Sequence, residues 1–308
     1  MGGFRGSWTR RTFGSHNEIE MPTMSILADL STAASSLAAD VAHRIVAVRG
    51  ADGRQLSGFI WSRGLVVTAE EGLGGEDEAE VLFADGKVVK ATIAGRDPST
   101  DVALLKLDTA EVADWAASAA VLPASFALIV GRGEASLIAS LSSVSEVGPA
   151  WRSMRGGEID ARINLGVRLS SRTEGAAVVA PDGSLVGMAV TSPRRRALVI
   201  PASTIARAVK TLAEKGYVPR GWLGVMLHPV GKGSGAIVLG IENDSPAAKA
   251  GLLVGDVITT WNGEAVESVG NIANRLAAGS VDAKINLGVL RGGNASDISV
   301  TLGERPRG

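Results

Sequence analysis

The sequence contains no cysteine, only one tyrosine and no excess of charge of either sign. The absence of cysteine excludes disulfides, cysteine-ligated zinc, iron–sulfur clusters and a cysteine nucleophile. The 31 Lys and Arg residues balance 32 Asp and Glu residues, so the strongly basic surface of nucleic-acid-binding proteins is not expected. A hydrophobic fraction of 45% is too high for a disordered chain. The sequence therefore predicts a folded protein without a nucleic-acid partner.

Long apolar segments are also missing. No stretch reaches the ~18–20 apolar residues of a membrane-spanning helix, and the nearest one, residues 26–42, is interrupted by Asp29 and Asp40. Residues 1–24 carry three arginines but no apolar core typical of a secretory signal. We therefore expect a flexible segment over residues 1–24, no membrane span and a cytoplasmic location. The alternative is a periplasmic or secreted protein whose N-terminus is incomplete.

Glycine is abundant, at 39 of 308 residues, and separates short apolar or β-branched runs. Such runs fill residues 43–107 and 121–190 and are typical of strands joined by tight turns. Apolar residues at helical spacing predict one helix over residues 24–42 and another over residues 201–216. Residues 221–303 alternate short strands with two short helices. The pattern favours a mainly β domain followed by a small mixed α/β module.

Four motifs resemble the HtrA/Deg family of trypsin-like serine proteases. They are SGFIWSRGLVVTAEEGL (57–73), GRDPSTDVALLKL (95–107), RGWLGV (220–225) and IENDSPAAKAGLLVGDVITTWNGEAV (241–266). The resemblance implies a mainly β fold. A chymotrypsin-like double β-barrel would occupy residues 25–216, and a PDZ domain would occupy residues 217–308.

The resemblance also implies where catalytic residues would lie. The position of the general-base histidine falls on Glu71, that of the aspartate on Asp101 and that of the nucleophilic serine on Glu174, with Arg172 at the oxyanion region. Serine-protease chemistry needs a hydroxyl, a base with a pKa near the working pH and two oriented N–H donors. A glutamate supplies no hydroxyl and is a poor base unless its pKa is strongly raised. We therefore expect a protein without protease activity.

Two alternatives remain open. One is an active serine endopeptidase that uses unidentified residues, although none of the three histidines (His16, His43 and His228) stands at the base position and nothing in the spacing supports a pair of Ser170 or Ser171 with Lys106. The other is a barrel that binds a metal or a small ligand. If Glu71, Asp101 and Glu174 converge, they should share protons, pair with Arg172 or bind a cation. The default expectation is no metal and no cofactor.

PDZ domains bind an extended peptide C-terminus as an added strand. The resemblance implies a groove with Trp222, Leu223, Gly224 and Val225 on one side and Ile272 and Leu276 on a helix. The expected partners are protein or peptide C-termini. The family resemblance further implies trimers, for which the helix over residues 24–42 is a candidate contact. The predicted function is that of a catalytically inactive HtrA-like protein that binds or scaffolds peptides and proteins, as in protein quality control.

Overall fold

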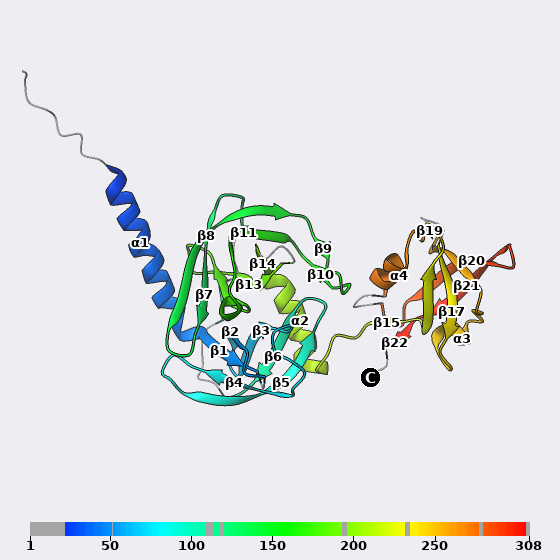
Figure 1. Ribbon diagram of the computed structural model, residues 1–308, viewed down its shortest axis with the longest axis horizontal. Helices are drawn as coiled ribbons and strands as arrows, with labels where there is room; N and C mark the ends of the chain where they lie inside the picture. The colour runs from blue at the N-terminus through cyan, green and yellow to red at the C-terminus, as the bar shows by residue number, and fades with distance from the viewer. Residues whose placement is uncertain are drawn as a thin grey trace, which may run out of the picture.

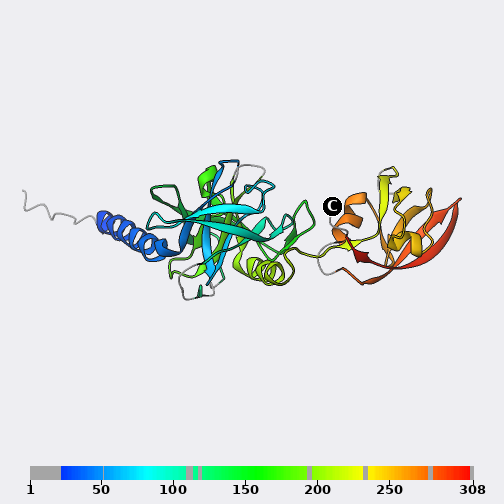
Figure 2. The same ribbon diagram turned by 90° about the horizontal axis from the view of Figure 1, so that it is seen from below.

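The computed structural model describes residues 22–50, 52–108, 114–116, 120–192, 196–231, 235–276 and 280–305. Two closed β-barrels are followed by a smaller sheet domain, and the N-terminal helix extends from the barrels on the side away from that domain (Figures 1 and 2). The prediction of a mainly β chain with a double β-barrel is confirmed. Most of the segment expected to be flexible, residues 1–21, lies outside the described residues, as does His16.

The first barrel closes in the order β1-β2-β3-β6-β5-β4. Its neighbouring strands are antiparallel, and the register of β3 against β6 pairs Ala69 with Val102. The end of β3 therefore lies beside the start of β6. The strands are β1 (Ile45–Arg49), β2 (Gln55–Ser62), β3 (Leu65–Ala69), β4 (Glu78–Leu82), β5 (Val88–Asp97) and β6 (Val102–Lys106).

The second barrel closes in the order β11-β14-β13-β12-β7-β8. A tight turn at residues 181–184 joins β12 to β13, and there the Asp182 carboxylate accepts hydrogen bonds from the N–H and the hydroxyl of Ser184. A short hairpin of two further strands extends from this barrel. The strands are β7 (Phe126–Arg132), β8 (Leu137–Gly148), β9 (Trp151–Arg152), β10 (Glu158–Ile159), β11 (Arg162–Arg168), β12 (Ala177–Val179), β13 (Leu185–Thr191) and β14 (Arg196–Pro201).

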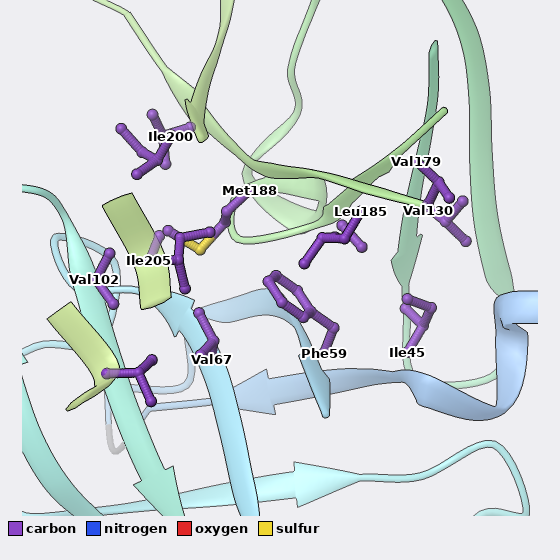
Figure 3. Close-up of a cluster of buried hydrophobic side chains, with 14 of the residues drawn as sticks. Ile45, Phe59, Val67, Val102, Val130, Val179, Leu185, Met188, Ile200 and Ile205 are labelled. Carbon is purple, nitrogen blue, oxygen red and sulfur yellow. The ribbon is translucent and has the colours of Figure 1, made fainter. Parts of the chain in front are cut away.

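The largest core cluster lies between the two barrels. Figure 3 shows Phe59 and Val67 of the first barrel packed toward Leu185 and Met188 of the second. Ile205 of helix α2 (Ala202–Lys215) closes this cluster, so the helix predicted over residues 201–216 is confirmed with a buried apolar face. The shared core holds the facing edges of the two barrels in fixed positions, and the candidate site lies on these edges.

The helix predicted over residues 24–42 is also confirmed. It is α1 (Pro22–Val41), and Ala42 instead begins the 3-10 turn η1 (Ala42–Arg44). Ala38 and Val41 are buried against the barrels, whereas Ile26 and Leu27 are 62% and 64% exposed. The first half of α1 thus carries apolar side chains that nothing in the described chain covers.

The C-terminal domain contains a sheet in the order β16-β17-β18-β20-β21, with β19 beside β18. Its separate core is built around Trp261, Ile272 and Leu287. Strand β16 is at the edge of this sheet, and α4 lies next to it. The elements are β15 (Gly221–Trp222), β16 (Val225–Pro229), β17 (Ala236–Ile241), α3 (Pro246–Lys249), β18 (Val257–Trp261), β19 (Glu264–Ala265), α4 (Val269–Arg275), β20 (Lys284–Arg291), β21 (Asn294–Thr301) and β22 (Gly303–Glu304).

Candidate functional site

The pairing of β3 with β6 brings Glu71 and Asp101 together. The N–H of Glu70 donates to the carbonyl of Asp101 at 3.3 Å, and the N–H of Glu71 donates to Asp101 Oδ1 at 2.8 Å. Asp101 has a φ of 58°, in the left-handed region that Asp and Asn tolerate better than most residues. The turn before β6 thus directs the Asp101 carboxylate at the backbone that follows β3.

Glu174 reaches the same place from the second barrel. It follows the 3-10 turn η2 (Ser171–Thr173), and its carbonyl accepts the N–H of Ser57 at 2.8 Å. The next residue, Gly175, has a φ of 81°, and a Cβ there would lie 2.2 Å from the carbonyl oxygen of Ser57 and 2.7 Å from Thr68 Oγ1. No side chain fits between these strands, so a glycine is required here. This close contact holds Glu174 against the first barrel.

The pKa of Asp101 reflects the convergence of these carboxylates. The pKa of Asp101 is raised to about 7, mainly by burial and in addition by the charges of Glu174, Glu71 and Glu70, against the lowering effect of the hydrogen bond from the Glu71 backbone. A carboxyl group with this pKa is about half protonated at neutral pH. Of the three outcomes considered for the carboxylates, a held proton fits this geometry.

Arg96 and Arg155 offset the negative charge of Glu70 and Glu71, whereas Arg172 does not. Glu70 lies 3.5 Å from Arg96 and 3.7 Å from Arg155, and Glu71 lies 3.9 Å from Arg155. Arg172 is exposed and forms no ion pair within the described chain. Within the described chain, the carboxylate of Glu174 accepts only a long hydrogen bond, 3.4 Å, from the N–H of Thr191. Pairing with Arg172, one of the three outcomes considered for the carboxylates, is therefore not found in the described chain.

The oxyanion region forms a closed turn. The N–H of Glu174 donates to the carbonyl of Ser171 at 3.3 Å, and the N–H of Thr173 donates to that of Ser170 at 3.0 Å. The Arg172 carbonyl accepts the hydroxyl of buried Ser57 at 2.6 Å. An oxyanion hole needs N–H groups that point at the substrate, whereas the N–H at the nucleophile position is here used inside the turn.

The alternative catalytic residues do not gather here. His43 is exposed in η1, and His228 is exposed on β16 in the other domain. The Ser170 hydroxyl lies 3.2 Å from that of Thr173. Lys106 pairs with Leu65 at the opposite end of the β3–β6 ladder from Asp101. The described residues include no group of three or more His, Cys, Asp or Glu that could hold a metal ion.

A second candidate site is a groove of about 500 Å³ between α4 and the segment that includes β15 and β16. Gly224, with a φ of 75°, packs so closely that a Cβ would lie 2.2 Å from the Cβ of Ser245. Within the described chain β16 pairs only with β17, so its other edge is open to an added strand. All six residues expected at a peptide groove line it: Trp222, Leu223, Gly224, Val225, Ile272 and Leu276.

Sequence reasoning missed the residues that enter these sites from distant segments. Met154 and Arg155, in the hairpin between β9 and β10, line the groove, and Arg155 also reaches Glu70 and Glu71. Arg305 and Glu242 line the groove as well. No local motif marks these four residues, because segments that are distant in the sequence bring them to the groove. Met154 and Arg155 arrive with the hairpin that packs beside α4. Arg152 in this hairpin donates to the carbonyl of Asn274 at 2.9 Å.

Two family models match the chain, a trypsin-like peptidase domain over residues 56–188 and a PDZ domain over residues 221–302. A protein of Brucella suis biovar 1 (strain 1330), named "Probable periplasmic serine endoprotease DegP-like", is 31% identical over 284 residues, covering 82% of this chain and 53% of the relative. A protein of the same name from Marinomonas sp. (strain MWYL1) is 30% identical over 270 residues, covering 81% and 57%. The chain thus spans about half the length of the curated relatives it matches.

Solved structures share the fold. The serine endoprotease from Yersinia pestis superposes with a TM-score of 0.69 at 23% identity, covering 88% of this chain and 98% of that chain. The HtrA-type protease AlgW with a decapeptide gives a TM-score of 0.69 at 23% identity, covering 89% and 99%.

The comparisons also correct one expectation. A cytoplasmic location is wrong, because the relatives are named periplasmic proteins; the expectation rested only on a missing apolar signal segment, which is a weak guide to compartment. Among the described helices, none has both the length and the hydropathy to cross a bilayer. The chain is an HtrA/DegP homologue, a trypsin-like peptidase domain followed by a PDZ domain.

Proposed function

We propose that this protein is a peptide-binding HtrA homologue that lacks serine-protease activity. The observation that carries the proposal is that glutamates fill both reactive positions: Glu71 lies beside Asp101, which accepts its backbone N–H at 2.8 Å, and Glu174 offers no hydroxyl. The N–H of Glu174 is bonded within the turn η2. Acyl transfer needs a hydroxyl nucleophile, an imidazole or similar base beside it and an oxyanion hole, and these positions provide no hydroxyl, no imidazole and no free N–H at Glu174.

The groove beside α4 supports the binding part of the proposal. It combines an open strand edge with apolar side chains from both walls, which is the arrangement that strand addition uses. We propose that peptide C-termini bind in this groove. We also propose that the barrel domain comprises residues 25–216 and the PDZ domain residues 217–308. The proposed location is the periplasm, which the names of the relatives give for those proteins.

The test is incubation of the full chain with unfolded casein and, separately, with a fluorophosphonate probe, beside a DegP-like relative as positive control. We expect neither casein cleavage nor labelling of a serine. The competing function is serine endopeptidase activity, which the relatives' names favour. Labelling that is lost in Ser170→Ala or Ser171→Ala would establish that competing function and overturn the proposal.

A further inference from the structure

Three arginines border the groove beside α4. Arg220 and Arg305 come from the PDZ domain, and Arg155 comes from the hairpin between β9 and β10. The only acidic side chain among the described lining residues is Glu242. The groove therefore has an excess of positive charge, although the chain as a whole has a net charge of −1.

The fold forces two of these cations together. Strand β15 pairs with β22, and just beyond this ladder the N–H of Arg305 donates to the carbonyl of Arg220 at 3.0 Å. Like charges opposite each other across a ladder are destabilising. Burial lowers the pKa of Arg220, which Asp97 partly opposes, and the charges of Arg305 and Arg155 lower it further.

No carboxylate in the described chain lies within 4.0 Å of the guanidinium group of Arg220 or of Arg305. Arg155 does face Glu70 and Glu71, but at 3.7 and 3.9 Å, which is longer than a charge-assisted hydrogen bond. The cluster of Arg155, Arg220 and Arg305 is thus incompletely neutralised. A bound anion would relieve the repulsion and would gain hydrogen bonds from the guanidinium groups.

Most of the other lining residues are apolar or glycine, with Val225, Leu227 and Leu276 among them. In an added strand successive side chains point to opposite faces. When the last side chain of a peptide occupies the apolar floor, the penultimate one points away from it, toward the side that Met154 and Arg155 border. We propose, on the basis of the peptide binding proposed above, that the groove selects C-termini with an apolar last residue and an acidic penultimate residue.

The experiment measures the binding of fluorescein-labelled Gly-Ser-rich peptides to the full chain by anisotropy. One peptide ends in Asp-Val, one in Asn-Val and one in Asp-Val with an amidated C-terminus. We expect the Asp-Val peptide to bind about 5-fold more tightly than the Asn-Val peptide at low salt, the upper range for exposed ion pairs. This ratio should decrease as salt screens the charges.

Arg155→Gln, Arg220→Gln and Arg305→Gln should each reduce the ratio toward one, and Arg155→Gln should reduce it most, because Arg155 borders the side to which the penultimate residue points. Lys284→Gln is the matched control, because it removes the same charge from an exposed position on β20 that does not line the groove. Arg305 is exposed at the end of the domain, so its variant tests the inference even if Arg220→Gln misfolds. Equal binding of the Asp-Val and Asn-Val peptides to the wild-type protein would overturn the acidic preference and leave peptide binding intact. Binding that does not respond to amidation, or no binding at all, would overturn the proposed peptide function itself.

Discussion

The backbone N–H of Glu71 donates a 2.8 Å hydrogen bond to the carboxylate of Asp101. A carboxylate in a serine-protease triad also accepts the imidazole N–H of the catalytic histidine. Asp101 accepts the main-chain N–H on one oxygen, but the side chain at the histidine position is a glutamate, which offers it no N–H. This contact and the closed turn before Glu174 determine how variants at these positions should behave.

Restoring the triad should give little activity. Glu71→His with Glu174→Ser supplies the missing side chains, but the N–H at position 174 remains bonded to the carbonyl of Ser171. Loss of one oxyanion donor reduces kcat by about 100-fold or more, so the double variant should remain at least that far below an intact relative. Casein hydrolysis and fluorophosphonate labelling measure this, and adding Arg172→Gly should increase both. Proteolysis by the double variant at the rate of the relative would refute this interpretation of the turn.

Removing the charge of Glu174 should stabilise the protein at alkaline pH. Because the folded pKa of Asp101 is raised to about 7, the native state holds a proton that the unfolded state releases near pH ~4. The stability this proton provides is complete at acid pH and is lost as the pH rises through the folded pKa. Glu174→Gln removes one of the charges that repel ionised Asp101.

We expect Glu174→Gln to raise Tm by about 2–4 °C at pH ~8, the shift that ~1 kcal/mol gives in a large domain. The increase should be smaller at pH ~4, where protonation has already relieved the repulsion. Thermal melts of both proteins at both pH values measure this. A variant less stable than the wild type at pH ~8 would mean that Glu174 makes a favourable interaction instead.

Asp101 itself allows a test that separates charge from conformation. Asn tolerates the φ of 58° and can still accept the Glu71 N–H, so Asp101→Asn should reduce the pH dependence of Tm without a general loss of stability. Asp101→Ala should be destabilised at every pH, by about 1 kcal/mol or more, because alanine is strained at positive φ and accepts no hydrogen bond. Equal pH profiles for Asp101→Asn and the wild type would show that Asp101 does not titrate as described.

Blocking the groove requires a site outside the domain core. Gly224→Trp places a side chain where Ser245 already lies, so we expect it to unfold the PDZ domain. Leu276→Arg, at a partly exposed lining position at the rim of the core, should lower the affinity for apolar C-terminal peptides by about 10-fold or more, because it places a charge under the ligand; its melting curve is measured alongside to confirm that the domain is folded. Leu253→Arg, at a position 52% exposed outside the groove, is the control. Unchanged titration curves for Leu276→Arg would show that peptides bind elsewhere.

The exposed half of α1 is the proposed contact between copies of the chain. Ile26 and Leu27 together present an apolar surface that is more than half exposed, and such surfaces favour association. We expect the wild-type protein to form a trimer and Ile26→Ser with Leu27→Ser to shift it to a monomer. Light scattering after size-exclusion chromatography measures the mass, with Asp29→Ser as the control. A double variant with the wild-type mass would exclude this contact.

Much of the fold was predictable, because it depends on local patterns. The helix α2 has its apolar residues at helical spacing, and the strands of both barrels are short β-branched runs between turns. The resemblance to the HtrA/Deg family implied the positions of Glu71, Asp101 and Glu174, each within a single segment. What those segments do together was not predictable: Arg155 reaches Glu71 from the second barrel, and Arg172 turns its carbonyl to Ser57. These contacts depend on packing between distant segments, which one sequence does not encode locally.

The left-handed backbone at Asp101 also affects what an aspartate at this position indicates about the activity of related proteins. A position with a φ of 58° accepts few residues other than Asp, Asn and Gly without strain. In a homologue without protease activity, folding alone would still favour Asp, Asn or Gly at this position. An aspartate at this position is therefore weak support for annotating a homologue as a protease, and the residues at positions 71 and 174 are better diagnostic characters.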